Sequence, residues 1–213
     1  SLDARVVVND IDADVAHETA RVLGPTCAVA CPSDVSTADG AGATIAAALD
    51  TFARVDAIVC NAGWSWHLPF AECTEADLRR VLEDHLFGTF HMIKAAWPHF
   101  AAQTRGRIVT TSSGAIFGYA GRSHYAAAKG AVLGLTNNVA LEGKPLGILA
   151  NTILPQADTR LAGPDSNAPD ASLAAPPVAR LCHRDCTDNG RLFVTGGDRF
   201  ARVVFDRRPV DER

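Results

Sequence analysis

The chain has 213 residues, 47% hydrophobic and 21% charged, which suffices for one large domain or at most two small ones with a buried core. Lys and Arg number 20 against 24 Asp and Glu, so the net charge of −4 leaves no basic surplus for nucleic acid or an anionic membrane surface. No apolar run could span a bilayer, and the first residues do not resemble a secretory signal. Six scattered cysteines make no disulfide scaffold, so we expect a cytoplasmic protein with reduced thiols.

Short apolar runs alternate along the chain with segments whose apolar residues recur at helical spacing. The pattern predicts strands over 6–10, 27–31, 57–60, 107–111, 148–154 and 192–194, and helices over 15–23, 41–52, 75–100 and 123–141. Strands that are apolar almost throughout, each followed by a helix, are typical of a parallel sheet covered on both faces. We therefore expect residues 1–213 to form a single doubly wound α/β domain.

Residues 155–177 interrupt this alternation, with Gly163-Pro164 and Pro176-Pro177 among small and acidic residues. We interpret this stretch as a long mobile loop, because the apolar run over 192–194 still needs a place in the same sheet. Loops of this length are either lids over a site or plain irregular segments, and both alternatives stay open.

Tyr125 and Lys129 stand four residues apart on an expected helix, so both side chains project from one face. A phenol ordinarily titrates near pH ~10, and a neighbouring ammonium lowers that pKa by stabilising the phenolate. Tyr125 could then exchange a proton near neutral pH. Ser112 and Ser113 lie at the carboxyl end of an expected strand, where such sheets bind ligands. The alternative is an ordinary solvated pair on a helix surface.

Several separated motifs together resemble the short-chain dehydrogenases/reductases over nearly the whole chain. Asn61-Ala62-Gly63 is similar to the family's Asn-Ala-Gly turn, and the Tyr125 to Lys129 segment is similar to its Tyr-x-x-x-Lys. The family's catalytic serine precedes the tyrosine by thirteen positions, which selects Ser112 over Ser113. The resemblance implies a Rossmann-like fold with Tyr125 as general acid or base, Ser112 bonded to the reacting oxygen, and Lys129 on the nicotinamide ribose.

The resemblance also implies a nicotinamide cofactor, with NAD favoured over NADP. Asp10 matches the family residue that binds the adenosine ribose, and its carboxylate would repel a 2′-phosphate. Asp34 and Val35 match the pair that holds the adenine, and Thr159 matches the threonine that meets the nicotinamide carboxamide. The implied cofactor-binding residues are Asp10, Asp34, Val35, Asn61, Ala62, Gly63, Tyr125, Lys129, Pro155 and Thr159.

A narrower resemblance is to the (3R)-hydroxyacyl-CoA dehydrogenase region of multifunctional enzymes type 2. The stretches that carry it are 7–10, 85–88, 95–97, 181–183 and 189–193. His85 stands where most of the wider family has the asparagine of a proton relay, and this subgroup often has histidine. Either His85 relays protons itself, or it packs the helix while its backbone carbonyl holds the relay water. The implied substrate is a small hydroxyl or carbonyl compound, a 3-hydroxyacyl-CoA among them, and the implied assembly is a homodimer or homotetramer.

The sequence departs from the family pattern at its start and after residue 154. The family's first strand and glycine-rich turn, which cradle the pyrophosphate, have no counterpart in this sequence, so we expect the strands over 6–10 and 57–60 to lack a shared neighbour. Pro155-Gln156 replaces the usual Pro-Gly. Two functions remain open: an NAD-dependent oxidoreductase, or a non-catalytic relative or fragment that has lost cofactor binding.

Two further clusters carry weaker signals. Cys182, His183 and Cys186 lack a fourth ligand for zinc, so we expect no metal site and interpret them as helix packing. Trp64, Trp66 and His67 follow the Asn-Ala-Gly turn and either line a substrate pocket or pack at its rim.

Overall fold

The computed structural model describes residues 4–159, 167–197 and 199–206. Its strands are β1 (Val6–Asp10), β2 (Ala28–Pro32), β3 (Ala57–Cys60), β4 (Gly106–Thr111), β5 (Ile148–Pro155), β6 (Leu192–Gly196) and β7 (Arg199–Val203). Its α-helices are α1 (Ala13–Leu23), α2 (Ala38–Phe52), α3 (Glu75–Leu82), α4 (Gly88–Ala102), α5 (Ser123–Gly143) and α6 (Ala175–Cys182). Shorter helical turns are η1 (Phe70–Glu72), η2 (Glu83–Phe87), η3 (Gly114–Phe117), η4 (Lys144–Leu146) and η5 (Ala171–Ala174).

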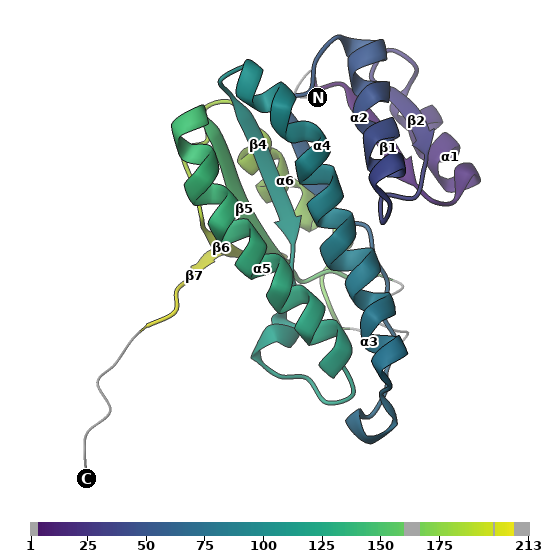
Figure 1. The fold of residues 1–213 in the computed structure, drawn as a ribbon, viewed down its shortest axis with the longest axis vertical. Helices are drawn as coiled ribbons and strands as arrows, with labels where there is room; N and C mark the ends of the chain where they lie inside the picture. The colour runs from purple at the N-terminus through teal and green to yellow at the C-terminus, as the bar shows by residue number, and fades with distance from the viewer. Residues whose placement is uncertain (1–3, 160–166, 198, 207–213) are drawn as a thin grey trace.

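The described strands form two sheets, which Figure 1 shows as an N-terminal unit beside a larger body. β1 and β2 pair in parallel by themselves. The second sheet has the order β3-β4-β5-β6-β7, parallel throughout except for the antiparallel β6–β7 pair. The expected α/β fold with a parallel sheet is confirmed. β1 and β3 share no ladder, so the expected single sheet is divided in two. The division lies between these two strands, for which the sequence analysis expected no shared neighbouring strand.

Side-chain caps determine where several helices begin. The Asp12 carboxylate accepts hydrogen bonds from the backbone N–H groups of Asp14 and Val15 at the start of α1. Thr74 and Asp77 form a reciprocal capping box at the start of α3. Such caps satisfy N–H groups that have no partner inside the helix, each contributing about 1 kcal/mol.

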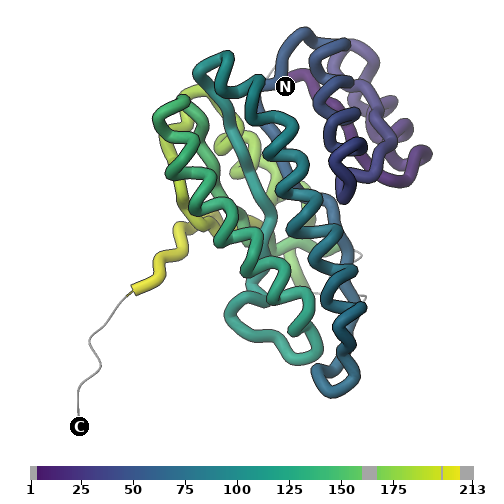
Figure 2. Tube along the Cα trace, in the orientation of Figure 1, coloured from purple at the N-terminus to yellow at the C-terminus, as the bar shows by residue number. Residues whose placement is uncertain are grey.

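The five-stranded sheet is covered by α4 and α5 on one face and by α6 on the other (Figure 1). Alternation along β4 supplies both cores, because successive residues of a strand point to opposite faces. Ile108 packs with Phe100 of α4 and Ile148, whereas Val109 packs with Leu181 of α6. The first core also takes in α2, which joins the N-terminal unit to α4, as the purple-to-blue end of the tube in Figure 2 shows.

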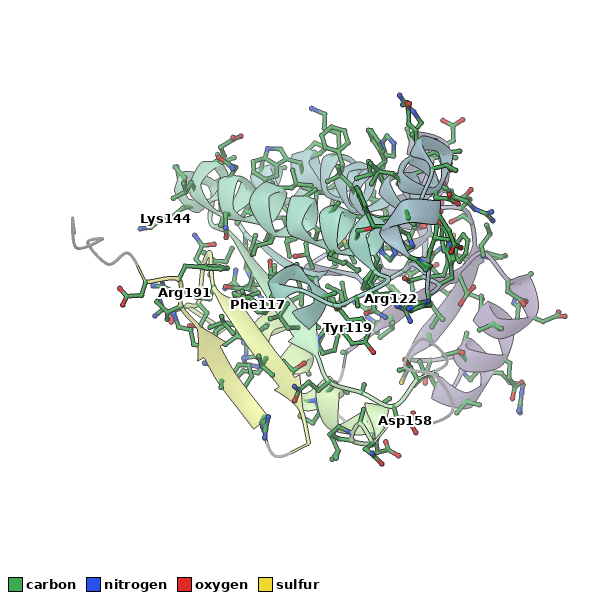
Figure 3. The ribbon with its side chains drawn as sticks, turned by 90° about the horizontal axis from the view of Figure 1, so that it is seen from below. Phe117, Tyr119, Arg122, Lys144, Asp158 and Arg191 are labelled. Atoms are coloured by element: carbon green, nitrogen blue, oxygen red, sulfur yellow. The ribbon has the colours of Figure 1, made fainter. Side chains whose placement is uncertain are left out.

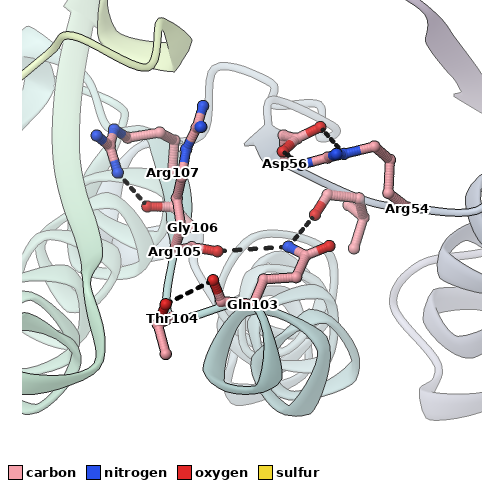
Figure 4. A network of polar contacts seen from close by, with 8 residues as sticks. Arg54, Asp56, Gln103, Thr104, Arg105, Gly106 and Arg107 are labelled. Carbon is pink, nitrogen blue, oxygen red and sulfur yellow. Dashed lines mark hydrogen bonds and ion pairs between the residues drawn. The ribbon is translucent and has the colours of Figure 1, made fainter.

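A polar network ties the amino ends of β3 and β4 to the end of α4 (Figure 4). Gln103 donates through Nε2 to the carbonyl oxygens of Val55, at 2.8 Å, and Arg105, at 3.4 Å. Arg54 pairs with Asp56 at 2.7 Å. The Gln103 bonds satisfy backbone carbonyl groups at the edge opposite to the carboxyl ends of the strands, and the whole network is structural.

Two local predictions need correction, and one strand was not predicted. The helical stretch over 75–100 is broken by η2, a single π-helical turn between α3 and α4. The loop expected over 155–177 contains η5 and the start of α6, because Pro176 and Pro177 occupy the first turn, where a missing N–H costs no hydrogen bond. Residues 160–166 of that loop lie outside the described part. β7 was not expected, and its pairing with β6 stabilises it.

All six cysteines are free thiols, Cys186 being buried among apolar side chains of the α6 face. Across the described residues, no helix is long and apolar enough to cross a membrane. In the same part of the chain, no three His, Cys, Asp or Glu side chains lie close enough to hold a metal ion.

Candidate active site

The carboxyl ends of β3, β4 and β5 lie at one edge of the larger sheet, because the three strands are parallel and adjacent. Asn61 follows β3, Thr111 ends β4, and Pro155 ends β5. The Thr111 hydroxyl donates to Asn61 Oδ1 at 3.0 Å. This bond ties the Asn-Ala-Gly turn to the strand that leads into Ser112 and Ser113.

Lys129 is buried against this edge, with 4% of its surface exposed. Its Nζ donates to the Thr111 carbonyl oxygen at 2.7 Å. Burial lowers the pKa of Lys129 to about 7, against a smaller opposing effect of the Cys60 thiol. An ammonium has three donors, and the described residues accept from one of them. Two donors therefore remain for a ligand, and two vicinal hydroxyls of a ribose suit them.

Tyr125 lies one helical turn before Lys129 on α5, with the Lys129 Nζ 5.7 Å from the centroid of its ring. Burial raises the pKa of Tyr125, while a side-chain hydrogen bond with Ser113 and the charge of Arg122 act in the opposite direction. The lowered pKa expected from Lys129 is not found in this structure. The reason is that desolvation penalises both charged forms, the phenolate and the ammonium.

The two adjacent serines make different contacts. Ser112 is 1% exposed, and its hydroxyl donates to the Lys129 carbonyl oxygen at 2.8 Å. Ser113 is half-buried, and its Oγ accepts the N–H of Ala115 at 3.2 Å as the cap of η3. The role of Ser112 expected from the thirteen-position spacing therefore stays a prediction.

His85 reaches the site because the π-helical turn η2 interrupts the helix between α3 and α4. Its Nε2 bonds to the Trp64 carbonyl oxygen at 2.8 Å, which requires a proton on Nε2, and its buried Nδ1 has no partner among the described residues. Burial, followed by the charge of Lys129, lowers the pKa of His85 to about 4. The imidazole is therefore neutral at physiological pH, with Nδ1 as an acceptor.

Gly63 permits this arrangement. Its φ is +144°, and a Cβ built on it would lie 2.0 Å from Cε1 of His85. Any side chain would both strain the backbone and displace the imidazole.

Trp64 and Trp66, from the segment after Gly63, form an aromatic wall with His124 of α5. The two indoles stack with centroids 4.7 Å apart, and Trp66 contacts His124 at 4.5 Å. Arg80 lies over Trp64, whose indole N–H donates to the Asp84 carboxylate. Burial raises the pKa of Asp84, against the effect of that hydrogen bond.

Arg122 and Ser65, which the sequence analysis did not single out, hold the same segment to the start of α5. Arg122 Nη1 donates to Ser65 Oγ at 2.7 Å, and the Leu68 N–H donates to the Gly121 carbonyl oxygen at 2.8 Å. Figure 3 shows Arg122 and Tyr119 near the amino end of α5 and Lys144 at its other end. No sequence pattern signals this positioning role, because it depends on a contact between residues 57 positions apart in the chain.

The remaining predicted cofactor residues lie around this cluster. Asp10 ends β1; its Oδ1 accepts the N–H of Asp12, and Oδ2 is without a partner among the described residues. Asp34 and Val35 follow β2, and the Val35 carbonyl oxygen faces Gly88 at the start of α4.

Pro155 borders an open pocket of about 540 Å³ at the carboxyl ends of β5 and β6. Thr159 is exposed beyond the end of β5 and does not line that pocket.

Residues 1–167 match the short chain dehydrogenase family. The chain belongs to this family. A short-chain type dehydrogenase/reductase of Mycobacterium tuberculosis is 40% identical over 83% of this short-chain dehydrogenase and 64% of the relative. The peroxisomal multifunctional enzyme type 2 of Mus musculus is 39% identical over 75% of this chain and 23% of that enzyme. A crystal structure of a short chain dehydrogenase from Mycobacterium avium superposes with a TM-score of 0.83 at 28% identity, covering 99% of this chain and 80% of that one.

The resemblance inferred from the motifs is thereby confirmed at the level of the family. This short-chain dehydrogenase spans only 64% and 23% of the lengths of those two relatives.

Proposed function

We propose that this protein is an NAD-dependent oxidoreductase that interconverts a secondary alcohol and a ketone. The observation that carries the proposal is the cluster at the start of α5: the Tyr125 phenol, a serine hydroxyl, the His85 imidazole, and the buried Lys129 ammonium with two unused donors. A half-buried phenol next to a hydroxyl donor suits proton exchange with an oxygen whose charge changes during the reaction.

The residues present fit the two nucleoside ends of NAD. The unused donors of Lys129 suit the nicotinamide ribose, and the partnerless Oδ2 of Asp10 suits the adenosine ribose. When bound, the nicotinamide accepts or supplies the hydride. Among the described residues no strand pairs with both β1 and β3, so no turn at that place is assigned to the pyrophosphate.

Tyr125 would hold the proton that moves to or from the substrate oxygen, as general acid in reduction and general base in oxidation. A serine hydroxyl would hydrogen-bond the same oxygen. His85 would accept a hydrogen bond at Nδ1 from a substrate hydroxyl or from one bridging water, because the buried neutral imidazole carries its proton on Nε2 and has a free lone pair on Nδ1. Asn61 and Thr111 would line the cofactor side of the same cluster.

The preference for NAD rests on Asp10. A carboxylate at the end of β1 accepts bonds from both ribose hydroxyls and repels a 2′-phosphate. The substrate class is proposed from the relatives: one is named a multifunctional enzyme and another, from Saccharomyces cerevisiae, a hydratase-dehydrogenase-epimerase. Together with the motif stretches over 85–88 and 189–193, these names favour a 3-hydroxyacyl-CoA.

A panel of secondary alcohols and 3-hydroxyacyl-CoA thioesters, assayed with NAD and with NADP, tests the function. Reduction of NAD by a (3R)-hydroxyacyl-CoA, faster than by the (3S) epimer, is the expected result. No turnover of any panel member in either direction would contradict it.

One observation favours the alternative of a non-catalytic relative: β1 and β3 share no ladder, so the two halves of the cofactor site belong to separate sheets. Titration with NADH, followed by nicotinamide fluorescence, separates the alternatives, because a non-catalytic relative that has lost the cofactor gives no saturable signal. The cytoplasm as location, and a homodimer or homotetramer as assembly, stay predictions that fractionation and light scattering test.

A further inference from the structure

Trp64 is bound through its side chain and its backbone by two consecutive residues of the π-helical turn η2. Its indole N–H donates to the Asp84 carboxylate, and its carbonyl oxygen accepts a hydrogen bond from Nε2 of His85 at 2.8 Å. Because a carbonyl oxygen can only accept, this bond requires the imidazole proton to be on Nε2. His85 is 2% exposed, so water does not compete for the bond. The position of the Trp64 carbonyl group therefore determines both the orientation and the tautomer of the imidazole.

The aromatic wall holds Trp64 against two helices. The Arg80 guanidinium carbon lies 4.4 Å from the centroid of the Trp64 ring. The rings of Trp64 and Trp66 are 4.7 Å apart and nearly parallel, at 21°, and Trp66 lies 4.5 Å from the ring of His124. Arg80 belongs to α3 and His124 to α5, so a row of four stacked side chains joins these helices. Stacked rings, and a cation over an indole, attract one another beyond the area they bury, and the row therefore fixes the segment over 64–66 relative to α5.

The row and the direct contact between His85 and Tyr125 close a ring of contacts. His124 immediately precedes Tyr125 on α5, and the Tyr125 phenol lies edge-on to His85 with the ring centroids 5.3 Å apart. Tyr125 is thus connected to His85 twice, once directly and once through the aromatic wall. A shift of the wall would move the Trp64 carbonyl oxygen relative to Tyr125, and the bonded imidazole with it.

The two nitrogens of His85 have different surroundings. A neutral imidazole can carry its proton on either nitrogen. The buried Nδ1 has no partner among the described residues, whereas Nε2 has the Trp64 carbonyl oxygen. This one bond therefore favours the Nε2 proton, and both forms should become populated once the bond is lost.

We propose that Trp64 and Trp66 are positioning residues for His85: the wall holds the Trp64 carbonyl oxygen where it keeps the proton on Nε2 and leaves the Nδ1 lone pair as an acceptor beside Tyr125. Each indole already stacks with two neighbours, which favours this role over stacking against a substrate. The effect of the wall on turnover rests on the proposed function, whereas its effect on the His85 tautomer does not.

The first test needs no substrate. In isotope-labelled protein at neutral pH, the nitrogen chemical shifts of an imidazole tell which ring nitrogen carries the proton. The chain has seven histidines, and the signals of His85 are those lost in His85→Asn. We expect the wild type to be protonated on Nε2, Trp66→Leu to show a mixture of both forms, and Trp66→Phe, which keeps a stacking ring, to retain the Nε2 form. A wild-type proton on Nδ1, or an unmixed Nε2 form in folded Trp66→Leu, would overturn the proposal.

Trp97, the third tryptophan of the chain, provides the matched control. It lies on α4 and packs against the core formed with α2. Trp97→Leu should lower the unfolding temperature and leave the His85 tautomer unchanged; a mixture of forms in this variant would reduce the effect of Trp66 to lost stability and refute the positioning role. If Trp66→Leu does not fold, Trp64→Phe replaces it, because the ring stays and the N–H bond to Asp84 is lost. Retention of the pure Nε2 form in Trp64→Phe would then contradict the proposal.

The second test uses turnover with the best substrate of the panel. Trp66→Leu should lower kcat by about ten- to a hundredfold, as a small displacement of a positioned group does, and should leave the KM for NAD unchanged. Trp66→Phe should recover most of the loss, and Trp97→Leu should match the wild type. An effect of Trp66→Leu on KM alone would argue against positioning of His85. If the wild type turns over nothing, the proposed function fails, while the tautomer measurement still tests the wall.

Discussion

The imidazole of His85 stands edge-on to the phenol ring of Tyr125, with the ring centroids 5.3 Å apart and an interplanar angle of 76°. His85 comes from a π-helical turn and Tyr125 from the first turn of α5, so the contact joins two helices across the site. The bond from His85 to the Trp64 carbonyl oxygen orients the ring, and Gly63 leaves room for it. An edge-on aromatic contact favours this relative orientation of the rings and restrains the phenol.

Replacing Tyr125 by Phe removes the proposed acid or base and keeps the ring contact with His85. We expect turnover to fall by about 10² to 10⁴, the contribution typical of a positioned acid or base. Initial rates of NAD reduction measure the effect. The matched control is Tyr119→Phe, which removes an exposed hydroxyl and should leave the rate unchanged. Near-normal turnover of Tyr125→Phe would exclude Tyr125 from the mechanism.

Acid should destabilise the protein through His85. The pKa of His85 is lowered from 6.5 to about 4 in the folded state, so below pH 6.5 the unfolded state binds a proton that the folded state refuses. Stability therefore falls as the pH drops from 6.5 to about 4, by about 3 kcal/mol from this residue. His85→Asn should remove most of this loss in denaturant unfolding at several pH values.

Two other histidines make the acid experiment specific. The pKa of buried His124 is also lowered, chiefly by burial, so part of the acid loss should persist in His85→Asn. His17 is exposed on α1, and His17→Asn should reproduce the wild-type pH dependence. An unchanged pH dependence in His85→Asn would show that its imidazole is not held neutral by burial.

Gly63→Ala should disrupt the site by placing a methyl group against the His85 ring. A Cβ at φ +144° and 2.0 Å from Cε1 combines backbone strain with a clash, and we expect a loss of about 2 to 4 kcal/mol in unfolding free energy. His85→Ala in the same chain should recover part of the loss by removing the clash. Gly42→Ala is the control: its Cβ would meet nothing within 4 Å inside α2, so it should stabilise by up to about 1 kcal/mol.

Asp10→Asn should shift cofactor preference toward NADP. The amide keeps an acceptor for the Asp12 N–H and removes the negative charge that would repel a 2′-phosphate. We expect the ratio of kcat/KM values for NADP and NAD to rise at least tenfold, corresponding to about 1.4 kcal/mol. Asp14→Asn, in the first turn of α1, should leave the ratio unchanged. A wild type that already prefers NADP would contradict the role of Asp10.

Much of the fold follows from short-range patterns. Apolar runs predicted every strand from β1 to β6, and helical spacing predicted α1, α2 and α5, because the period of the side chains is a property of each element alone. The four-residue spacing of Tyr125 and Lys129 placed both on one face of α5 for the same reason. β7 was not predicted, because most of its residues, including Arg199 and Arg202, are exposed and show no alternation of apolar and polar side chains.

The properties that define the site depend on contacts between segments distant in sequence. Burial raises the pKa of Tyr125 and lowers that of Lys129, and the tertiary packing sets that burial. The spacing motif could not predict the contacts of the two serines: Ser112 donates to the Lys129 carbonyl oxygen, and Ser113 accepts the Ala115 N–H. The sequence by itself determined which residue types stand near the strand ends. The tertiary structure decided which of their atoms meet and how strongly each charge is desolvated, since both depend on distances across the fold rather than along the chain.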